Sequence, residues 1–131
     1  MILVDTGGWY AYFVSSDTDH EKAAEWMLTN SEPLLTTDYI IDETLTLLRA
    51  RGQKRKAIEF GLLIFSGRLG RVHYLTRAEI AAAWDVFRTF ADKEWSFTDC
   101  TSKVVIESLG IPTAFAFDQH FRQFGTVAVV P

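Results

Sequence analysis

Four acidic side chains stand where an ordinary structural role explains each of them only weakly: Asp5, Glu43, Asp99 and Asp118. Asp5 follows the apolar run Ile2–Val4. Asp118 likewise follows the run Thr113–Phe117, although aspartate is disfavoured in strands. The carboxyl ends of parallel strands share one edge of a sheet, where α/β proteins bind ligands, so we expect these two carboxylates to converge. Each could instead cap the helix that follows it, and the sequence favours neither role.

The other two acids fall on predicted helices. In the helix expected over Asp38–Arg51, Glu43 lies at the edge of the apolar stripe, where an unpaired carboxylate is costly. Asp99 begins the helix expected over Asp99–Gly110 and lies on its inward stripe, at the end where the helix dipole favours an anion. Each again has a simple alternative. Glu43 could reach water, and Ser96-Phe97-Thr98-Asp99 has the spacing of a capping box.

Together the four acids indicate a metal site. Several carboxylates in one cleft repel one another unless a proton or a cation intervenes. Oxygen ligands of this kind suit Mg²⁺ or Mn²⁺ rather than zinc. A cation held there can bind a phosphodiester, lower the pKa of an attacking water and neutralise the leaving oxygen. The acids alone therefore predict a metal-dependent nuclease or phosphatase.

The elements that must position these acids are short apolar runs that alternate with longer helical patterns. The runs predict strands at Ile2–Val4, Pro33–Thr36, Val72–Leu75, Thr113–Phe117 and Val127–Val130. The helical patterns cover Gly8–Val14, His20–Asn30, Asp38–Arg51, Lys54–Gly70, Arg77–Ala91, Asp99–Gly110 and Gln119–Phe124. This alternation is typical of parallel β-α units. We expect one three-layer α/β/α domain over residues 1–131, with a central parallel sheet of about five strands.

Composition and charge narrow the function classes. Of 131 residues, 48% are hydrophobic and 23% are charged, which excludes a disordered chain or a coiled coil. Thirteen Lys and Arg against seventeen Asp and Glu give a net charge of −4. A protein that binds nucleic acid mainly through its net charge is normally basic, so any nucleic-acid binding must depend on a local site. No apolar stretch approaches ~18 residues and no leader pattern opens the chain, so we expect a soluble, cytoplasmic protein without membrane contact.

Four segments carry a resemblance to a known family: ILVDTGGWYAYF, LLTTDYIIDETLTLLRARG, WSFTDCTSKVVIESLGI and TAFAFDQHFRQFG. With them, the chain from Ile2 to Pro131 resembles the PIN-domain ribonucleases, and among these the VapC-type toxins of bacterial and archaeal toxin–antitoxin pairs. The ordered set of acids, with Thr98-Asp99 and the stretch from Phe117 to Phe121, is more specific than the opening Asp-Thr alone. One residue departs from the family pattern, because Cys100 stands where a small alanine is more usual.

The resemblance implies a PIN fold and cleavage of single-stranded or looped RNA, often transfer RNA, with Mg²⁺ or Mn²⁺. It assigns Asp5, Glu43 and Asp99 as the core metal ligands. It assigns Asp118 as a supporting carboxylate or a ligand of a second metal. It matches Thr6 and Thr98 to small hydroxyl positions beside the metal. It also implies a homodimer, neutralised by a cognate antitoxin with a segment that fills the active-site groove.

Basic residues offer contacts for phosphate or for the antitoxin. Five of them fall at the predicted corner between two helices: Arg49, Arg51, Lys54, Arg55 and Lys56. This cluster could contact RNA at the rim of the cleft, but solvated basic corners are commoner. Arg122, four residues after Asp118, is a second candidate. The apolar run Phe60–Phe65 predicts a helix that is either buried or covered by a partner, and the family resemblance places antitoxin contacts on this helical pair.

The remaining chemistry-bearing residues give weaker signals. His20, His73 and His120 lack metal-ligand spacing, so we interpret all three as structural, and Cys100 as a packed thiol.

Three alternative functions are open. A haloacid-dehalogenase-like or receiver-like domain also has Asp at strand ends, but Gly7 stands where its second acid is required. A non-catalytic PIN-like binding module would lose the four acids, which are all present. A PIN-fold nuclease that processes RNA without a toxin role would keep them.

Overall fold

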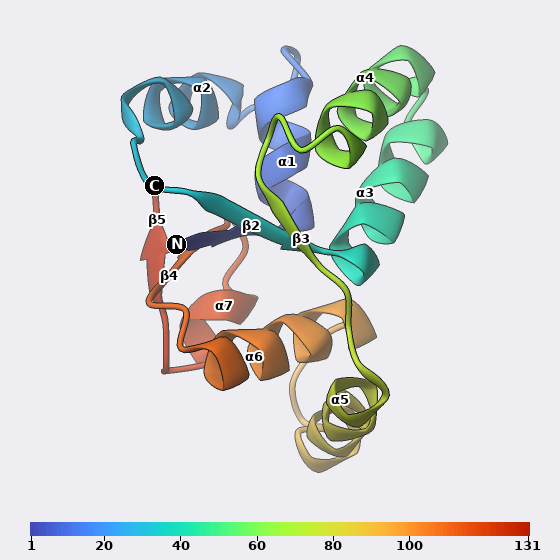
Figure 1. Ribbon diagram of the computed structural model, residues 1–131, viewed down its shortest axis with the longest axis vertical. Helices are drawn as coiled ribbons and strands as arrows, with labels where there is room; N and C mark the ends of the chain where they lie inside the picture. Colours follow the sequence, from blue (N-terminus) through green and yellow to red (C-terminus); the bar gives the residue numbers. More distant parts are fainter.

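Five short strands form one parallel sheet at the centre of the computed structural model, which covers residues 1–131 (Figure 1). The strands are β1 (Ile2–Val4), β2 (Leu34–Thr37), β3 (Arg71–His73), β4 (Thr113–Phe115) and β5 (Ala128–Val130). Their order is β3-β2-β1-β4-β5, and Ile2 in the central strand lies opposite Leu34 and Thr113. The strand order reverses between β1 and β4, so the crevice expected to bind a ligand lies beyond the carboxyl ends of these two strands.

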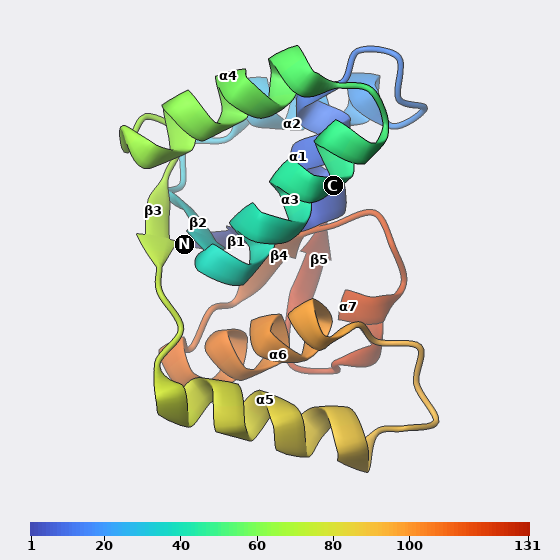
Figure 2. The same ribbon diagram turned by 90° about the vertical axis from the view of Figure 1, so that its right-hand side faces the viewer.

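Seven helices cover the two faces of this sheet (Figure 1 and Figure 2). One face carries α1 (Thr6–Phe13), α2 (His20–Thr29), α3 (Asp38–Ala50) and α4 (Lys54–Phe65). The other face carries α5 (Arg77–Thr89), α6 (Phe97–Leu109) and the short α7 (His120–Gln123). No helix is both long and apolar enough to cross a membrane. The predicted three-layer α/β/α class with a five-stranded parallel sheet is therefore confirmed.

The core fixes the helices that frame the crevice. β1 is buried along its whole length, as expected for a central parallel strand that helices cover on both faces. Trp9 on α1 packs against Phe60 on α4 with 5.5 Å between ring centroids. Its indole Nε1 donates a hydrogen bond to Thr36 Oγ1 on β2 at 3.3 Å. The start of α1, directly after Asp5, is thus held by the sheet and by α4.

All the predicted elements occur, with shifted boundaries. α1 begins at Thr6 rather than Gly8, because Asp5 itself occupies the N-cap position with extended backbone. α4 ends at Phe65 rather than Gly70, since Gly67 adopts a left-handed φ of +78°. β4 ends at Phe115 rather than Phe117, where its neighbour β5 also ends. Asp118 therefore lies in the loop before α7 and not directly at a strand end.

Candidate active site

Asp5 is placed at the bottom of the crevice by the junction of β1 and α1. Its carboxylate is buried, with 3% of the residue exposed, and its side chain makes no capping hydrogen bond to α1. Asp5 thus occupies the N-cap position of α1 without the side-chain hydrogen bond that the capping alternative requires. Burial raises the pKa of Asp5 well above its usual range, and the charges of Asp118, Asp99 and Glu43 raise it further, against the opposing effect of the Thr6 backbone N–H. The other three predicted acids thus all act electrostatically on Asp5.

Asp99 lies in the first turn of α6 and is almost fully buried. Its backbone N–H donates to Ser96 Oγ at 3.0 Å, and its Oδ2 accepts from the Ser96 backbone N–H at 3.0 Å. The predicted capping box is therefore present. It orients the Asp99 carboxylate, which still lies among the other acids. Burial raises the pKa of Asp99, and the nearby Asp118 carboxylate adds to this, while the Ser96 N–H and His120 oppose it.

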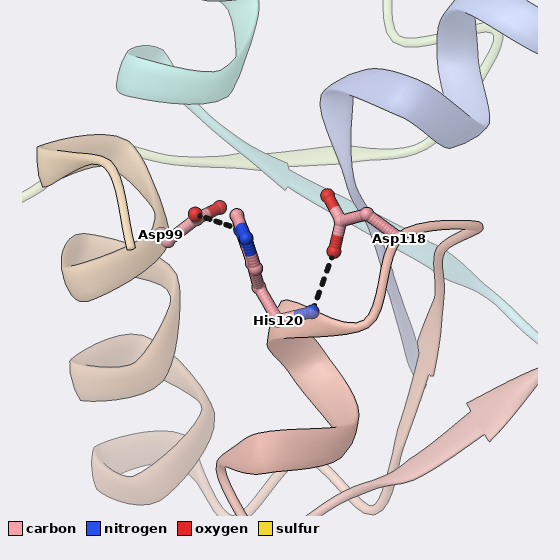
Figure 3. Close-up of side chains that lie close together, drawn as sticks. All are labelled: Asp99, Asp118 and His120. Atoms are coloured by element: carbon pink, nitrogen blue, oxygen red, sulfur yellow. Dashed lines mark hydrogen bonds and ion pairs between the residues drawn. The ribbon is translucent and has the colours of Figure 1, made fainter. Parts of the chain in front are cut away.

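Asp118 and His120 form the exposed side of the site (Figure 3). Asp118 Oδ1 accepts the backbone N–H of His120 at 2.9 Å, and His120 Nδ1 lies 2.8 Å from Asp99 Oδ2. Ligand atoms of Asp99, Asp118 and His120 all lie within 4.8 Å of one another. The structure thus brings His120, which the sequence indicates only as structural, into contact with the acidic cluster. Sequence spacing missed it because its contact with Asp99 joins residues 21 positions apart on two helices.

The two other histidines do fit a structural role. His20 Nδ1 lies 2.8 Å from the carbonyl oxygen of Ala11, across the connection between α1 and α2. His73 Nε2 pairs with Glu79 Oε1 at 2.9 Å, next to the start of α5. Neither contact involves one of the four predicted acids, so the earlier interpretation holds for both.

Three further predicted residues flank the carboxylates. Glu43 is half-buried on α3, and its charge acts on Asp5, but no ion pair holds it. Thr6, beside Asp5, has a buried hydroxyl without a hydrogen-bond partner. Thr98 directly precedes Asp99 in the first turn of α6, where it is half-buried.

This arrangement fits a divalent cation. No Lys or Arg forms an ion pair with any of the four acids, and His120 bonds Asp99 alone, so no cationic side chain of the protein pairs with Asp5. The donors are hard oxygens, the type that Mg²⁺ and Mn²⁺ prefer. The unpartnered Thr6 hydroxyl adds a polar atom that a metal-bound water could satisfy. A polar depression of about 590 Å³, lined by Asp118, His120 and the Asp92–Glu94 loop among others, leads into the site from the α7 side.

The predicted basic residues lie at the surface. Of the five at the corner between α3 and α4, Lys56 is half-buried and four are exposed: Arg49, Arg51, Lys54 and Arg55. Arg51 stacks over the Tyr10 ring, with 5.0 Å between its guanidinium and the ring centroid. Arg122 is exposed on α7, two residues after His120. The basic side chains are thus free to meet a partner or solvent, and none of them enters the acidic cluster.

Helix α4 is only half covered by its own chain. Phe60 and Ile64 are buried, whereas Ile58, Leu62 and Phe65 are more than half exposed. Deep burial within the monomer is therefore wrong as an explanation for the whole apolar run. An apolar hollow of about 330 Å³ lies between α3 and α4, lined by Leu45, Arg49, Lys54, Ala57, Ile58 and Gly61.

Known proteins resemble this chain in sequence and in fold. A family model described as the PIN domain matches residues 2–127. The 23S rRNA-specific endonuclease VapC20 of Mycobacterium tuberculosis is 33% identical over 131 residues, which cover 100% of this chain and 99% of that protein. A VapC ribonuclease of Archaeoglobus fulgidus is 29% identical over 91% of this chain and 78% of its own length.

Solved structures agree with the sequence comparisons. The crystal structure of M. tuberculosis VapC20, described as a sarcin-ricin loop cleaving toxin, superposes with a TM-score of 0.92 and 31% identity over the full length of both chains. FitAcB from Neisseria gonorrhoeae has a TM-score of 0.72 at 18% identity, covers 100% of this chain and 97% of its own, and so supports the fold alone. The chain belongs to the PIN-domain family and, within it, to the VapC-type ribonucleases.

Proposed function

We propose that this protein is a metal-dependent endoribonuclease and the toxin of a toxin–antitoxin pair. The observation that carries the proposal is that the other three predicted acids lie near enough to the buried Asp5 to raise its pKa by their charges, while no cationic side chain pairs with it. Membership of the VapC-type ribonucleases supports the reaction class. Buried carboxylates that repel one another destabilise a fold, so a site that keeps them gains from a bound cation.

In the proposed site, Asp5, Glu43 and Asp99 hold Mg²⁺ or Mn²⁺, and Asp118 supports them from the exposed side. A cation bound there supplies the positive charge that binds the scissile phosphate and favours ionisation of water. The chain's own residues do the rest. Asp118, at the mouth of the site, orients the attacking water. Thr6 and Thr98 offer hydroxyls beside the carboxylates, and Arg122 contacts a neighbouring phosphate of the RNA.

We propose a loop of ribosomal RNA as the substrate. The relative that matches this chain end to end is named as specific for 23S rRNA, and its crystal structure is described as that of a toxin that cleaves the sarcin-ricin loop. This substrate takes precedence over transfer RNA. An unpaired loop also suits the site, because a shallow open depression admits a splayed phosphodiester more readily than a rigid duplex.

The cleavage experiment uses purified protein, intact 23S rRNA and either Mn²⁺ or Mg²⁺, with EDTA as the metal-free arm. We expect one discrete cut that requires metal. Asp5→Asn and Glu43→Gln should each reduce the rate by at least ~100-fold, because each removes a proposed ligand charge. Asp42→Asn is the matched control for Glu43→Gln, because Asp42 is the exposed neighbour of Glu43 on α3. The Asp42→Asn variant should cleave RNA at the wild-type rate.

Two results would contradict the proposal. Cleavage that persists in EDTA and in Asp5→Asn would show that the acids do not perform the reaction. Absence of cleavage by folded protein, with either metal and with 23S rRNA or total small RNA, would favour the non-catalytic PIN-like binding module. A cut that matures an RNA precursor without arresting growth on expression would favour the RNA-processing nuclease.

We propose that the cognate antitoxin binds the half-covered face of α4 and the hollow beside α3. Ile58 lines this hollow together with the basic residues Arg49 and Lys54. The exposed Leu62 lies one turn further along α4. This chemistry fits a helix with an apolar face and acidic flanks. Leu62→Glu should abolish neutralisation by the cognate antitoxin while leaving RNA cleavage by the free toxin unchanged. Loss of both activities together would contradict this assignment.

A homodimer completes the proposed assembly. Trp84 and Phe87 on α5 stack with 6.1 Å between ring centroids, and they are 54% and 41% exposed in the monomer. Contiguous exposed aromatics of this kind mark protein–protein contacts. Light scattering after size exclusion should give twice the 14.9 kDa chain mass for the wild type and a shift toward the monomer for Trp84→Ala. A wild-type monomer at high concentration would refute the dimer.

A further inference from the structure

We infer that His120 is a positioning residue for the Asp99 carboxylate. Its imidazole fixes one oxygen of Asp99 and leaves the other free to bind the cation. This inference rests on the proposed function, because it assigns His120 a role within the same metal site. The inference follows from the contacts around Asp99.

The two oxygens of Asp99 have different surroundings. Oδ2 accepts two hydrogen bonds, from the Ser96 backbone N–H at 3.0 Å and from His120 Nδ1 at 2.8 Å. Oδ1 accepts none from the protein, so it remains available to a ligand. A carboxylate can only accept, so the contact with His120 requires the proton on Nδ1. Two donors on Oδ2, one from the N-cap of α6 and one from α7, thus define the orientation of the carboxylate plane. Figure 3 shows the second of them, His120.

His120 is itself held in place. The Asp118 carboxylate accepts its backbone N–H at 2.9 Å, so one short turn sets Asp118 and the imidazole on the same side of the site. The helix that begins at His120 is anchored in the core by Phe121, which is fully buried. Gln123 Oε1 also accepts a hydrogen bond from Trp95 Nε1 at 2.8 Å. A ring on so firmly packed an element can orient its partner.

The position of this contact separates it from an ordinary structural histidine. His73 makes an equally short bond to Glu79, but that pair lies beside the N-terminus of α5 and touches none of the four acids. The His120 bond ends on a buried member of the acidic cluster. Hydrogen bonds to the ligating carboxylates of metal sites commonly change metal affinity or activity by about 10–100-fold when they are removed.

The test measures Mn²⁺ affinity by calorimetric titration of the whole protein, without RNA. His120→Ala should weaken Mn²⁺ binding by about 10–100-fold. His120→Asn should restore affinity to within a few-fold of wild type, because the amide nitrogen of Asn can occupy the place of Nδ1 and donate to Asp99. His120→Gln should not restore it, since its longer side chain carries the amide to the place of Nε2. In cleavage assays at fixed metal, His120→Ala should lower kcat with little change in KM for RNA.

Two controls make the outcomes distinct. His73→Ala removes a histidine–carboxylate bond away from the site and should leave Mn²⁺ affinity unchanged. Asp99→Asn should abolish Mn²⁺ binding. If the wild type binds no Mn²⁺, the proposed function and this inference both fail. If Asp99→Asn loses binding but His120→Ala keeps the wild-type affinity, the inference alone fails. If His120→Gln keeps the wild-type Mn²⁺ affinity and His120→Asn loses it, the inference is also overturned, because Nε2 of His120 would then bind the cation directly.

Discussion

Gly8 on α1 lies directly against Phe115, the last residue of β4. A Cβ atom on Gly8 would stand 2.9 Å from the carbonyl oxygen of Phe115 and 2.5 Å from its ring atom Cδ1. The Phe115 carbonyl also accepts the backbone N–H of Asp5 at 3.1 Å. The absence of a side chain at Gly8 thus allows α1 to approach β4. That approach joins the chain segment that carries Asp5 to the strand that leads to Asp118.

Gly8→Ala should therefore destabilise the protein despite the better helix propensity of alanine. The propensity gain is about 1 kcal/mol, whereas forcing a methyl group against backbone and a buried ring costs about 1–3 kcal/mol or more. Gly7→Ala is the matched control, because its Cβ would meet only Asp5 Oδ2, at 3.9 Å. Urea unfolding in EDTA should show a lower free energy of unfolding for Gly8→Ala than for the wild type, and a slightly higher one for Gly7→Ala. Equal gains for both would disprove the close-approach argument.

The sequence was sufficient to predict the layers, the sheet and the four acids. Alternating apolar runs reveal strands and helices because their periods differ, and Asp5 was conspicuous because it follows a run as apolar as β1. The role of Gly8 could not be predicted, since it depends on a close approach between segments far apart in the chain. The contact between His120 and Asp99 was hidden for the same reason. Pairing across 21 residues depends on how α6 and α7 pack, and no local spacing encodes that packing.

The pair of His73 and Glu79 should make stability depend on acid pH. Partial burial would raise the pKa of Glu79, but the Thr76 backbone N–H and the His73 imidazole outweigh it and hold the pKa below its ordinary value of 4.5. A lowered pKa in the folded state stabilises the protein above the unfolded-state value and loses this effect as pH falls through the folded value. Glu79→Gln should thus cost about 1 kcal/mol at pH 7, and the difference should vanish well below pH 4.5.

Urea unfolding of the wild type and Glu79→Gln between pH 3 and 7 measures this difference directly. Glu59→Gln provides a surface comparison, because Glu59 pairs with Lys56 in an exposed position on α4. Its effect at pH 7 should stay below about 0.5 kcal/mol. A penalty for Glu79→Gln that is constant down to pH 3 would mean that the charge of Glu79 plays no part in the pair.

Cys100 should be chemically inert in the folded protein. Burial and the neighbouring Asp99 carboxylate raise the pKa of its thiol to about 11, although Lys103 acts in the opposite direction. The thiolate is the reactive form, so alkylation by iodoacetamide at pH 8 should be roughly 100-fold slower than in the urea-unfolded chain. Mass spectrometry of timed samples gives both rates. Fast alkylation of native protein would contradict the burial of this residue in α6.

Asp5→Asn should make the metal-free protein more stable while it abolishes activity. Burial and the charges of Asp118 and Asp99 raise the pKa of Asp5, so its ionised form destabilises the fold at neutral pH. An amide of the same shape removes that repulsion. We expect a higher Tm for Asp5→Asn than for wild type in EDTA, by a few degrees for each ~1 kcal/mol of relief.

Added Mn²⁺ should reverse this order. A cation that binds only the folded state stabilises it by RT ln(1 + [L]/Kd), or about 2.7 kcal/mol at a hundredfold excess over Kd. The wild type should therefore gain several degrees in Tm with Mn²⁺, whereas Asp5→Asn should gain little. Asp42→Asn, which alters an exposed acid on α3, should respond to Mn²⁺ as the wild type does. If Asp5→Asn were less stable than wild type in EDTA, the repulsion around Asp5 would be relieved within the protein, and the physical case for a cation between these carboxylates would fail.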